Sequence, residues 1–213
     1  MSSSRFPGKV LAPFRGEPLI AHVIRAVSSV LGSDRVVVAT SSEVSDDPLC
    51  AYLESLRCNY FRGSLQDVFD RFRQCLEAFP ADWVLRICAD SPLLQTMPLE
   101  HVIKRAEEVD CDIVTTTFPR TFPKGTNAEL IRATTFVGVD RSELTDEDQE
   151  HVTRFFYRNP HRFRIVNVAS SVPGLSGLNY AVDTVEDLHR LEDLIAAEPA
   201  GVVPFQGPGV GRQ

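Results

Sequence analysis

The chain has 213 residues, 43% of them hydrophobic, and a formal net charge of −7. This length and composition predict one globular domain with a sizeable core. The acidic balance argues against general nucleic-acid binding, which favours a basic surface, but it allows a nucleotide whose charge is met locally. No apolar run approaches about 18 residues and no apolar signal segment follows the N-terminus, so we expect neither a transmembrane helix nor a secretory signal.

The five cysteines indicate a reduced, cytoplasmic protein. They stand at positions 50, 58, 75, 88 and 111. None forms a CxxC pair, and none has the histidine spacing of a zinc site. An odd number of cysteines is typical of free thiols in the cytoplasm. We therefore expect reduced thiols and no zinc site.

The hydrophobic pattern alternates between helical and extended segments as far as residue 116. Apolar residues between Leu19 and Leu31 recur at helical spacing, and the run Val36-Val37-Val38 is typical of a strand buried on both faces. In chain order, the pattern predicts a helix at 18–31, a strand at 35–40, a helix at 45–57, a strand at 59–62, a helix at 66–79, a strand at 83–87, a helix at 98–109 and a strand at 113–116. This alternation predicts an α/β fold of three layers, Rossmann-like, with helices on both faces of a mostly parallel sheet.

After Phe118 the pattern loosens. A proline-rich loop precedes predicted strands at 128–131, 163–168 and 179–182 and predicted helices at 146–158 and 184–197. The last helix opens with the capping-box spacing Thr184-x-x-Asp187. We expect residues 1–197 to form a single domain, in which 118–170 is a small excursion that offers a homodimer contact. Residues 198–213 are rich in proline and glycine, which predicts a disordered tail.

The run Arg5-Phe6-Pro7-Gly8-Lys9 is a candidate phosphate-binding turn. Gly8 can adopt backbone angles that other residues avoid, and Pro7 stiffens the approach to it. Arg5 and Lys9 place two cations around the turn, and charged donors with free backbone N–H groups suit a polyphosphate. The alternative is a surface turn with two solvated cations.

Two aspartates come just after predicted strands, at the sheet edge where ligands of α/β proteins bind. They are Asp90 and Asp183. Two carboxylates at strand ends can share Mg²⁺, which keeps waters and takes substrate phosphates as its other ligands. The alternatives are local: Asp90 orients the turn at Ser91-Pro92, and Asp183 favours the N-terminus of the next helix. The two aspartates together with the Gly8 turn favour a metal–nucleotide site.

Several segments resemble the cytidylyltransferase family, which includes the CMP-sialic-acid and CMP-KDO synthetases. The greatest likeness is to the spore-coat polysaccharide biosynthesis branch. The matches occur in order from residue 2 to about 197, and they are Ser3-Ser4-Arg5-Phe6-Pro7-Gly8-Lys9-Val10-Leu11, Phe61-Arg62-Gly63-Ser64, Asp67-Val68-Phe69-Asp70-Arg71, Arg86-Ile87-Cys88-Ala89-Asp90-Ser91-Pro92-Leu93, Arg120-Thr121-Phe122-Pro123-Lys124-Gly125, Glu150-His151-Val152-Thr153 and Val182-Asp183-Thr184-x-Glu186-Asp187-Leu188.

The resemblance implies a nucleotidyltransferase that converts CTP and an acidic sugar to a CMP-sugar and pyrophosphate, for surface polysaccharide synthesis. It implies that Arg5, Gly8 and Lys9 bind the triphosphate, that Arg5, Lys9 and Asp90 are catalytic, and that Asp90 and Asp183 hold Mg²⁺. Nucleotide-pocket or structural positions by the same resemblance are Arg62, Asp67 and Arg86. Sugar-side positions are Lys124, Asn127, Glu129 and His151. For His151, on its predicted helix, the alternative is a half-buried residue with a backbone or carboxylate partner.

The chain departs from the family at three places. Ala89 stands where the family often has glycine, and Asn127 stands where an acidic residue or serine is common. The family's first strand is absent, and Met1 aligns with the methionine that ends it. We therefore expect Met1 to be an internal methionine of a longer reading frame, or the chain to be a truncated protein of low stability.

Two other functions stay open from the sequence. One is a glycosyltransferase that uses a nucleotide sugar, although the Asp-x-Asp metal motif of such enzymes is missing around Asp90. The other is a non-catalytic remnant that only binds partners.

Overall fold

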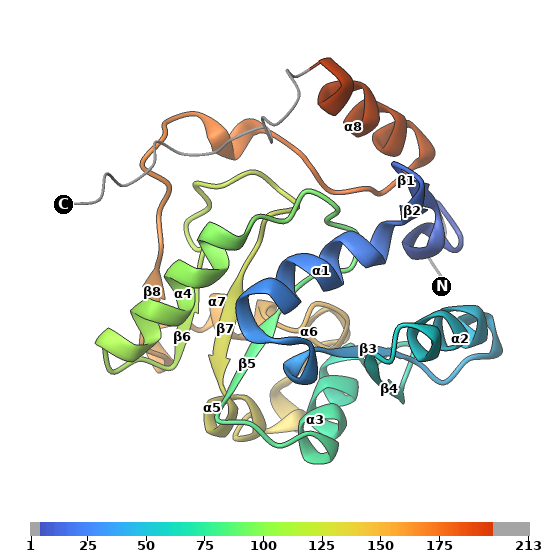
Figure 1. The fold of residues 1–213 in the computed structure, drawn as a ribbon. Coiled ribbons are helices and arrows are strands. Elements are labelled where there is room, and N and C mark those ends of the chain that lie inside the picture. Colours follow the sequence, from blue (N-terminus) through green and yellow to red (C-terminus); the bar gives the residue numbers. More distant parts are fainter. Residues whose placement is uncertain (1–4, 198–213) are drawn as a thin grey trace.

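A computed structural model of the chain describes residues 5–197, and Figure 1 shows its fold. Four strands form one sheet in the order β5-β7-β6-β8. Their bounds are β5 (Trp83–Arg86), β6 (Ile113–Thr115), β7 (Glu129–Arg132) and β8 (Ile165–Asn167). A second pair, β3 (Val37–Ser41) and β4 (Asn59–Gly63), is parallel, and β1 (Pro13–Phe14) and β2 (Glu17–Pro18) form a short hairpin.

The α/β prediction is confirmed, but the main sheet is mixed. β6 and β8 are parallel, whereas β7 is antiparallel to both of its neighbours. A parallel neighbour needs a crossover, usually a helix, and an antiparallel neighbour does not. Between β6 and β7 the chain has no helix, only the loop 116–128, so β7 enters the sheet in the opposite direction.

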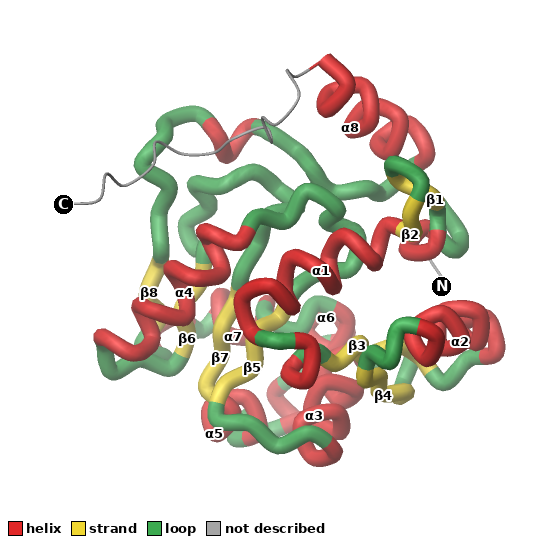
Figure 2. Tube along the Cα trace, viewed as in Figure 1, coloured by secondary structure: helices red, strands yellow, loops and turns green. Residues whose placement is uncertain are grey.

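Helices cover both faces of the main sheet (Figure 2). The core on one face joins α1 (Leu19–Leu31), α4 (Thr96–Glu108) and α8 (Val185–Ala197) to Val114 and Leu130. The core on the other face joins α3 (Val68–Ala78), α5 (Ala133–Val137) and α7 (Arg154–Arg158) to Ile113 and Ile131. Neighbouring strand residues point to opposite faces, so the apolar runs of β6 and β7 serve both cores. A smaller cluster packs α2 (Asp47–Ser55) against Ile20 of α1.

Most predicted elements lie within two residues of the observed ones. This holds for the predicted helices at 18–31, 45–57, 66–79, 98–109 and 184–197. The range 118–170, expected as an excursion, contains β7 and β8 of the main sheet and two of the three helices of the second core, α5 and α7. Its role in a dimer stays a prediction, and the predicted tail at 198–213 lies outside the described residues.

The prediction of a strand at 179–182 is wrong. This segment makes one isolated bridge, between Asn179 and Lys124, and is otherwise outside any ladder. It is held by single hydrogen bonds to two different loops, since Tyr180 N donates to Lys124 O at 2.7 Å and Val182 N donates to Asp90 O at 2.9 Å. An apolar extended segment that lies between two loops has the same sequence pattern as a strand, although no neighbouring strand pairs with it.

The prediction of one helix over 146–158 is also wrong. The structure has α6 (Asp146–Glu150) and α7, separated by His151 to Thr153. Arg158 Nε reaches back to Asp148, 2.9 Å from its Oδ2. Ten residues of continuous helix rise about 15 Å, so this ion pair requires the chain to turn between the two residues. Asp148 also completes a capping box with Thr145 at the start of α6.

The buried carboxylate of Asp148 should make the free energy of unfolding depend on pH. Burial opposes its ionisation, but hydrogen bonds from Arg158 and Thr145 outweigh burial and lower the pKa of Asp148 below its usual 3.8. Asp148→Asn should reduce the free energy of unfolding near neutral pH by about 1.5–3 kcal/mol, as expected for hydrogen bonds to a charged group. Because the folded-state pKa is lowered, this contribution is complete above about pH 4 and is lost as the pH falls through the folded pKa.

Urea unfolding at several pH values checks this, with the exposed Asp146→Asn as the control from the same helix. The difference between wild type and Asp148→Asn should shrink with acidification. A difference that stays constant down to acidic pH would contradict a charge-based role.

A second prediction about stability concerns the edges of β3 and β5 that pair with no other described strand. Among residues 5–197, no strand pairs with the second edge of either strand. By contrast, β7 is paired on both sides. Unpaired edges open more readily. In hydrogen exchange followed by mass spectrometry, amides of β3 should therefore exchange faster than those of β7. Equal protection would mean that another segment covers the β3 edge.

Candidate active site

The turn that carries Lys9 is built around Gly8. Gly8 has a φ of 73° and a ψ of 10°, the left-handed conformation that glycine adopts without strain. It starts a short 3₁₀ helix over Lys9–Leu11, and Leu11 N donates to Gly8 O at 2.9 Å. The Lys9 backbone is further held by a hydrogen bond from its N–H to Phe6 O at 3.2 Å. This local geometry anchors the base of the Lys9 side chain.

Asp90 and Asp183 come from distant parts of the chain. Asp90 follows β5, and Asp183 precedes α8. Thr184 N donates to the Asp187 carboxylate at 3.1 Å and Asp187 N donates to Thr184 Oγ1 at 3.2 Å, so the predicted capping box is present. Asp183 N also donates to the Asp187 carboxylate, at 3.1 Å. The hydrogen bond from Val182 N to Asp90 O ties the two segments together.

Lys9 lies between these two carboxylates. Its Nζ is 2.8 Å from Asp90 Oδ2 and 3.3 Å from Asp183 Oδ1, and it also donates to Val182 O at 2.8 Å. The Lys9 side chain is 15% exposed. The structure thus brings together three residues that the sequence singled out separately.

Two more cations approach Asp183 from its other oxygen. Lys124 Nζ is 3.0 Å from Asp183 Oδ2, and Arg5 Nη2 is 3.4 Å from the same atom. Burial opposes ionisation of Asp183, but hydrogen bonds from Lys124 and Lys9 lower its pKa below the usual value. The cluster therefore holds two carboxylates and three cations, an excess of positive charge that suits a polyanionic ligand.

Gly125 brings Lys124 to this cluster, and in the sequence it stands out only as the last residue of the family-like segment that begins at Arg120. Its φ is 88°, and a Cβ atom there would lie 2.4 Å from Ala181 N. Only glycine lets the loop approach residues 180–181 this closely. Hydrogen bonds on both sides of the contact, from Lys124 N to Leu178 O and from Tyr180 N to Lys124 O, depend on that approach.

The donor set fits Mg²⁺. Asp90 and Asp183 present two carboxylates to one point, the chemistry of a hard-cation site. Among residues 5–197 there is no group of three or more histidine, cysteine or acidic side chains arranged to hold a metal. Mg²⁺ at this point would therefore complete its coordination with waters and substrate phosphates, as Mg²⁺ commonly does.

Arg86 and Glu129 form a buried pair in the sheet. They stand directly opposite each other on β5 and β7, with Arg86 Nη1 2.5 Å from Glu129 Oε2. Tyr157 Oη donates to Glu129 Oε1 at 2.8 Å and also contacts Thr115 Oγ1 at 2.9 Å. Glu129 is 3% exposed, so these contacts favour a structural role over direct sugar contact. No motif or spacing in the sequence points to Tyr157.

Two other predicted nucleotide-pocket residues hold loops. Arg62 contacts the loop after β3, donating from Nε to Ser41 O at 3.0 Å and pairing with Asp47 at 2.7 Å. Asp67 caps α3, where its Oδ1 accepts from Asp70 N at 2.8 Å. These contacts match the structural alternative for both positions. Neither residue joins the Lys9 cluster through an observed hydrogen bond or ion pair.

Of the remaining sugar-side residues, Asn127 accepts a hydrogen bond from Arg120 and His151 is exposed. His151 directly follows α6, in the break before α7, and does not lie within a helix. The half-buried alternative for His151 is therefore wrong.

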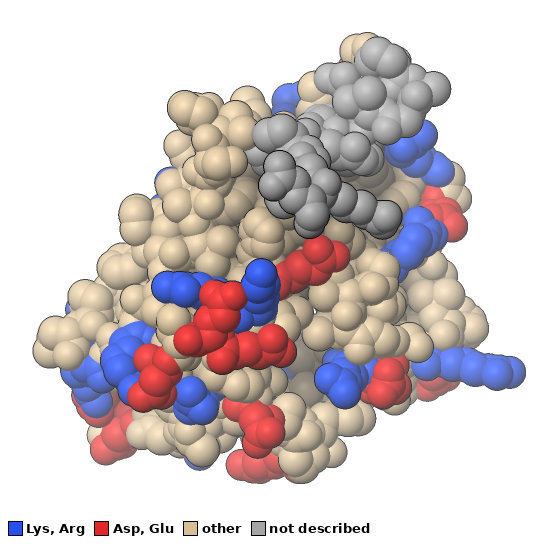
Figure 3. Space-filling model, turned by 60° about the vertical axis from the view of Figure 1, so that its left-hand side comes forward, with Lys and Arg blue, Asp and Glu red and all other residues tan. Residues whose placement is uncertain are grey.

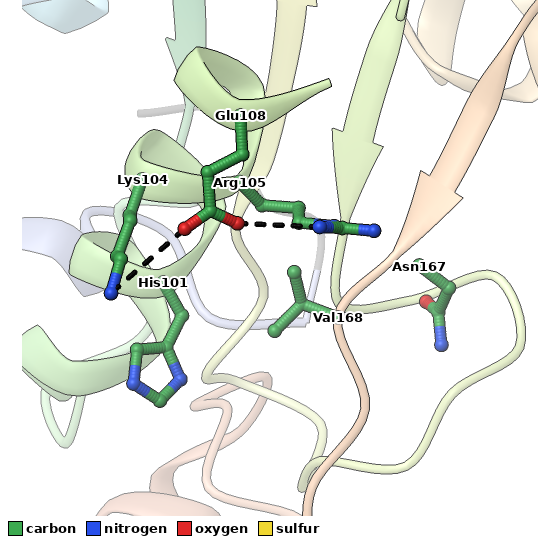
Figure 4. A pocket seen from close by; sticks show the side chains of 6 residues that line it. All are labelled: His101, Lys104, Arg105, Glu108, Asn167 and Val168. Atoms are coloured by element: carbon green, nitrogen blue, oxygen red, sulfur yellow. Dashed lines mark hydrogen bonds and ion pairs between the residues drawn. The ribbon is translucent and has the colours of Figure 1, made fainter.

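A shallow hollow lies elsewhere, between α4 and the end of β8 (Figure 4). Lys104 and Arg105 both pair with Glu108 there, so one carboxylate offsets one of the two positive charges. Acidic and basic side chains are also intermingled on the face in Figure 3, without a continuous basic surface. None of the five residues gathered around Lys9 (Arg5, Lys9, Asp90, Lys124 and Asp183) lines this hollow.

No described helix has both the length and the apolar character that crossing a bilayer requires.

Comparison with known proteins identifies the family. The cytidylyltransferase family model matches residues 1–194. The chain is 31% identical to the spore coat polysaccharide biosynthesis protein SpsF of Bacillus subtilis (strain 168), over 78% of this chain and 70% of that protein. It is 27% identical to the 8-amino-3,8-dideoxy-manno-octulosonate cytidylyltransferase of Shewanella frigidimarina (strain NCIMB 400), over 92% of this chain and 82% of that enzyme.

Solved structures support the same fold. A cytidylyltransferase from Leptospira borgpetersenii serovar Hardjo-bovis (strain JB197) superposes with a TM-score of 0.87 at 23% identity, covering 94% of this chain and 84% of that chain. A CMP:2-keto-3-deoxy-manno-octonic acid synthetase complexed with CTP has a TM-score of 0.65 at 18% identity, covering 92% and 94%. At these identities the structural likeness establishes the fold alone. The match of the family model along nearly the whole chain shows that this protein belongs to the cytidylyltransferase family of nucleotidyltransferases.

Proposed function

We propose that this chain transfers the cytidylyl group of CTP to an acidic sugar, giving a CMP-sugar and pyrophosphate, in an Mg²⁺-dependent reaction. The product would serve surface polysaccharide synthesis in the cytoplasm. The observation that carries the proposal is the convergence of three cations and two carboxylates at one point. A triphosphate, an acidic sugar and Mg²⁺ together present the complementary charges.

The reaction is a displacement at phosphorus. A sugar hydroxyl oxygen forms a bond to the α-phosphorus, the bond from the α-phosphorus to the bridging oxygen breaks, and pyrophosphate leaves with that electron pair. The hydroxyl proton passes to water. Such transfer depends on positioning and on neutralising charge, so no covalent nucleophile is required.

Each residue of the cluster has a role in that scheme. Asp90 and Asp183 would hold Mg²⁺, which supplies Lewis-acid stabilisation of the phosphoryl oxygens. Arg5 and Lys9 neutralise the negative charge on the departing pyrophosphate. Lys124, whose side chain is 51% exposed, stands at the solvent side and binds the carboxylate of the acceptor sugar. Arg62 and Asp67 hold the loops that form the nucleotide pocket.

The test is release of pyrophosphate from CTP in the presence of Mg²⁺ and a panel of ulosonic and nonulosonic acids. We expect release that depends on both CTP and the sugar acid. Sugar transfer from a UDP-sugar would instead support a glycosyltransferase. Absence of CTP binding in calorimetry would overturn the proposal and favour a non-catalytic remnant.

A further inference from the structure

The Lys9 ammonium is surrounded as a bound cation would be. Three oxygens contact it, from Asp90, Asp183 and the Val182 carbonyl, at 2.8, 3.3 and 2.8 Å. The side chain is mostly enclosed, at 15% exposure. It is therefore an internal counter-ion for both carboxylates.

Two cations cannot share this position. A divalent ion bound by Asp90 and Asp183 together would lie between their carboxylates, where Nζ now stands. Like charges at contact distance repel strongly away from bulk water, so metal entry requires Lys9 to leave. Lys124 and Arg5 differ in this respect, because they contact Oδ2 of Asp183 and do not touch Asp90 in any observed ion pair.

A displaced Lys9 needs a new anionic partner. Its backbone is held by the Gly8 turn, so the ammonium can swing only within reach of its own side chain. The triphosphate of the nucleotide is the partner that enters with the metal. Metal that arrives alone leaves Lys9 without a partner, whereas metal that arrives with the nucleotide does not.

We propose that Lys9 competes with the divalent cation for Asp90 and Asp183, and so couples metal binding to nucleotide binding. This inference rests on the metal site of the proposed function. It makes the free site weak for metal alone and favours joint entry of metal and CTP. Coupling of this kind is reciprocal and typically amounts to about 5–150-fold in affinity.

The first test measures Mn²⁺ binding to the nucleotide-free protein by electron paramagnetic resonance. Lys9→Met should bind Mn²⁺ about tenfold more tightly than wild type, within the usual range of coupling. Lys124→Met is the matched control, since it removes a cation that contacts only Asp183 among the two aspartates. If loss of a positive charge alone mattered, both variants would gain the same affinity for Mn²⁺, and that result would overturn the proposal. Lys9→Gln, which keeps a hydrogen-bond donor, serves if Lys9→Met does not fold.

The second test uses wild-type protein and its three lysines, Lys9, Lys104 and Lys124. Reductive methylation followed by peptide mass spectrometry reports the accessibility of each amine. Lys104 is the reference, at 73% exposure on α4. Saturating Mg²⁺ should raise labelling of Lys9 several-fold relative to Lys104, and added CTP should protect Lys9 again.

The outcomes separate this inference from the proposed function. Suppose that Mn²⁺ binds to wild type but not to Asp90→Asn, and that Mg²⁺ leaves the labelling of Lys9 unchanged. The competition is then refuted, while the metal site stands. If neither wild type nor Lys9→Met binds Mn²⁺, the metal site itself is refuted and the inference with it.

Discussion

Asp90→Asn is expected to lower kcat by roughly 10²–10³-fold, the range seen when one preorganised charge-stabilising group is removed. The substitution keeps the size of the side chain and removes one of the two carboxylates that meet at Lys9. The fold should survive, because the backbone of Asp90 still accepts from Val182 N. Pyrophosphate release from CTP measures the rate, and thermal melting measures the stability.

Asp82→Asn is the matched control. Asp82 is an exposed aspartate directly before β5, at the opposite end of the strand from Asp90. The control should turn over and melt like wild type. Wild-type turnover in Asp90→Asn itself would remove Asp90 from the proposed metal site.

Most of the helices and the meeting of Lys9 with the aspartates could be anticipated from the sequence. Helix periodicity is local, and strand ends of α/β proteins converge at one edge, so residue order alone places Asp90 near a polar turn. The sequence places Asp183 at the same edge through a predicted strand at 179–182 that the structure lacks. Its position is instead set by the hydrogen bond that joins Val182 to Asp90.

The pairing of Arg86 with Glu129 could not be anticipated. It depends on the register of β7 against β5, and β7 enters the sheet antiparallel after a loop. A pattern of parallel strands and helices predicts no cross-strand partner for Arg86. The sequence predicts that Lys9 lies near the two aspartates, but it does not predict that the Lys9 ammonium contacts both carboxylates. Sequence spacing indicates which charged residues lie near one another, but it does not show which of them are in direct contact when no ligand is present.

The break between α6 and α7 shows the limit of periodicity. Residues from Asp146 to Arg158 have a pattern compatible with one helix, and no proline or glycine interrupts them. The pair formed by Asp148 and Arg158 is a tertiary contact that fixes the turn between them. Helix propensity depends on the local sequence and gives no information about such a tertiary contact.

Glu129→Gln should produce the largest loss of stability among the variants considered. Removing one partner of a buried ion pair leaves the other charge uncompensated, at a cost of about 3–5 kcal/mol. Arg86 is enclosed enough for this rule, since its side chain is 20% exposed and that of Glu129 is 4% exposed. A loss of this size compares with a total stability of about 5–15 kcal/mol for a domain. For a chain of this length it corresponds to a fall in Tm of roughly 6–20 °C.

The double variant Arg86→Met with Glu129→Leu distinguishes a charge effect from a packing effect. Replacing both members of a buried pair by apolar residues of similar volume is often nearly neutral, because no charge is then left without a partner. Urea unfolding should therefore show the double variant closer to wild type than Glu129→Gln is. Tyr157 sets the limit of that recovery, since its hydroxyl loses Glu129 and keeps only the threonine contacts. If the double variant is as unstable as the sum of both single substitutions, the two side chains stabilise the sheet independently, and the ion pair is not what holds β5 against β7.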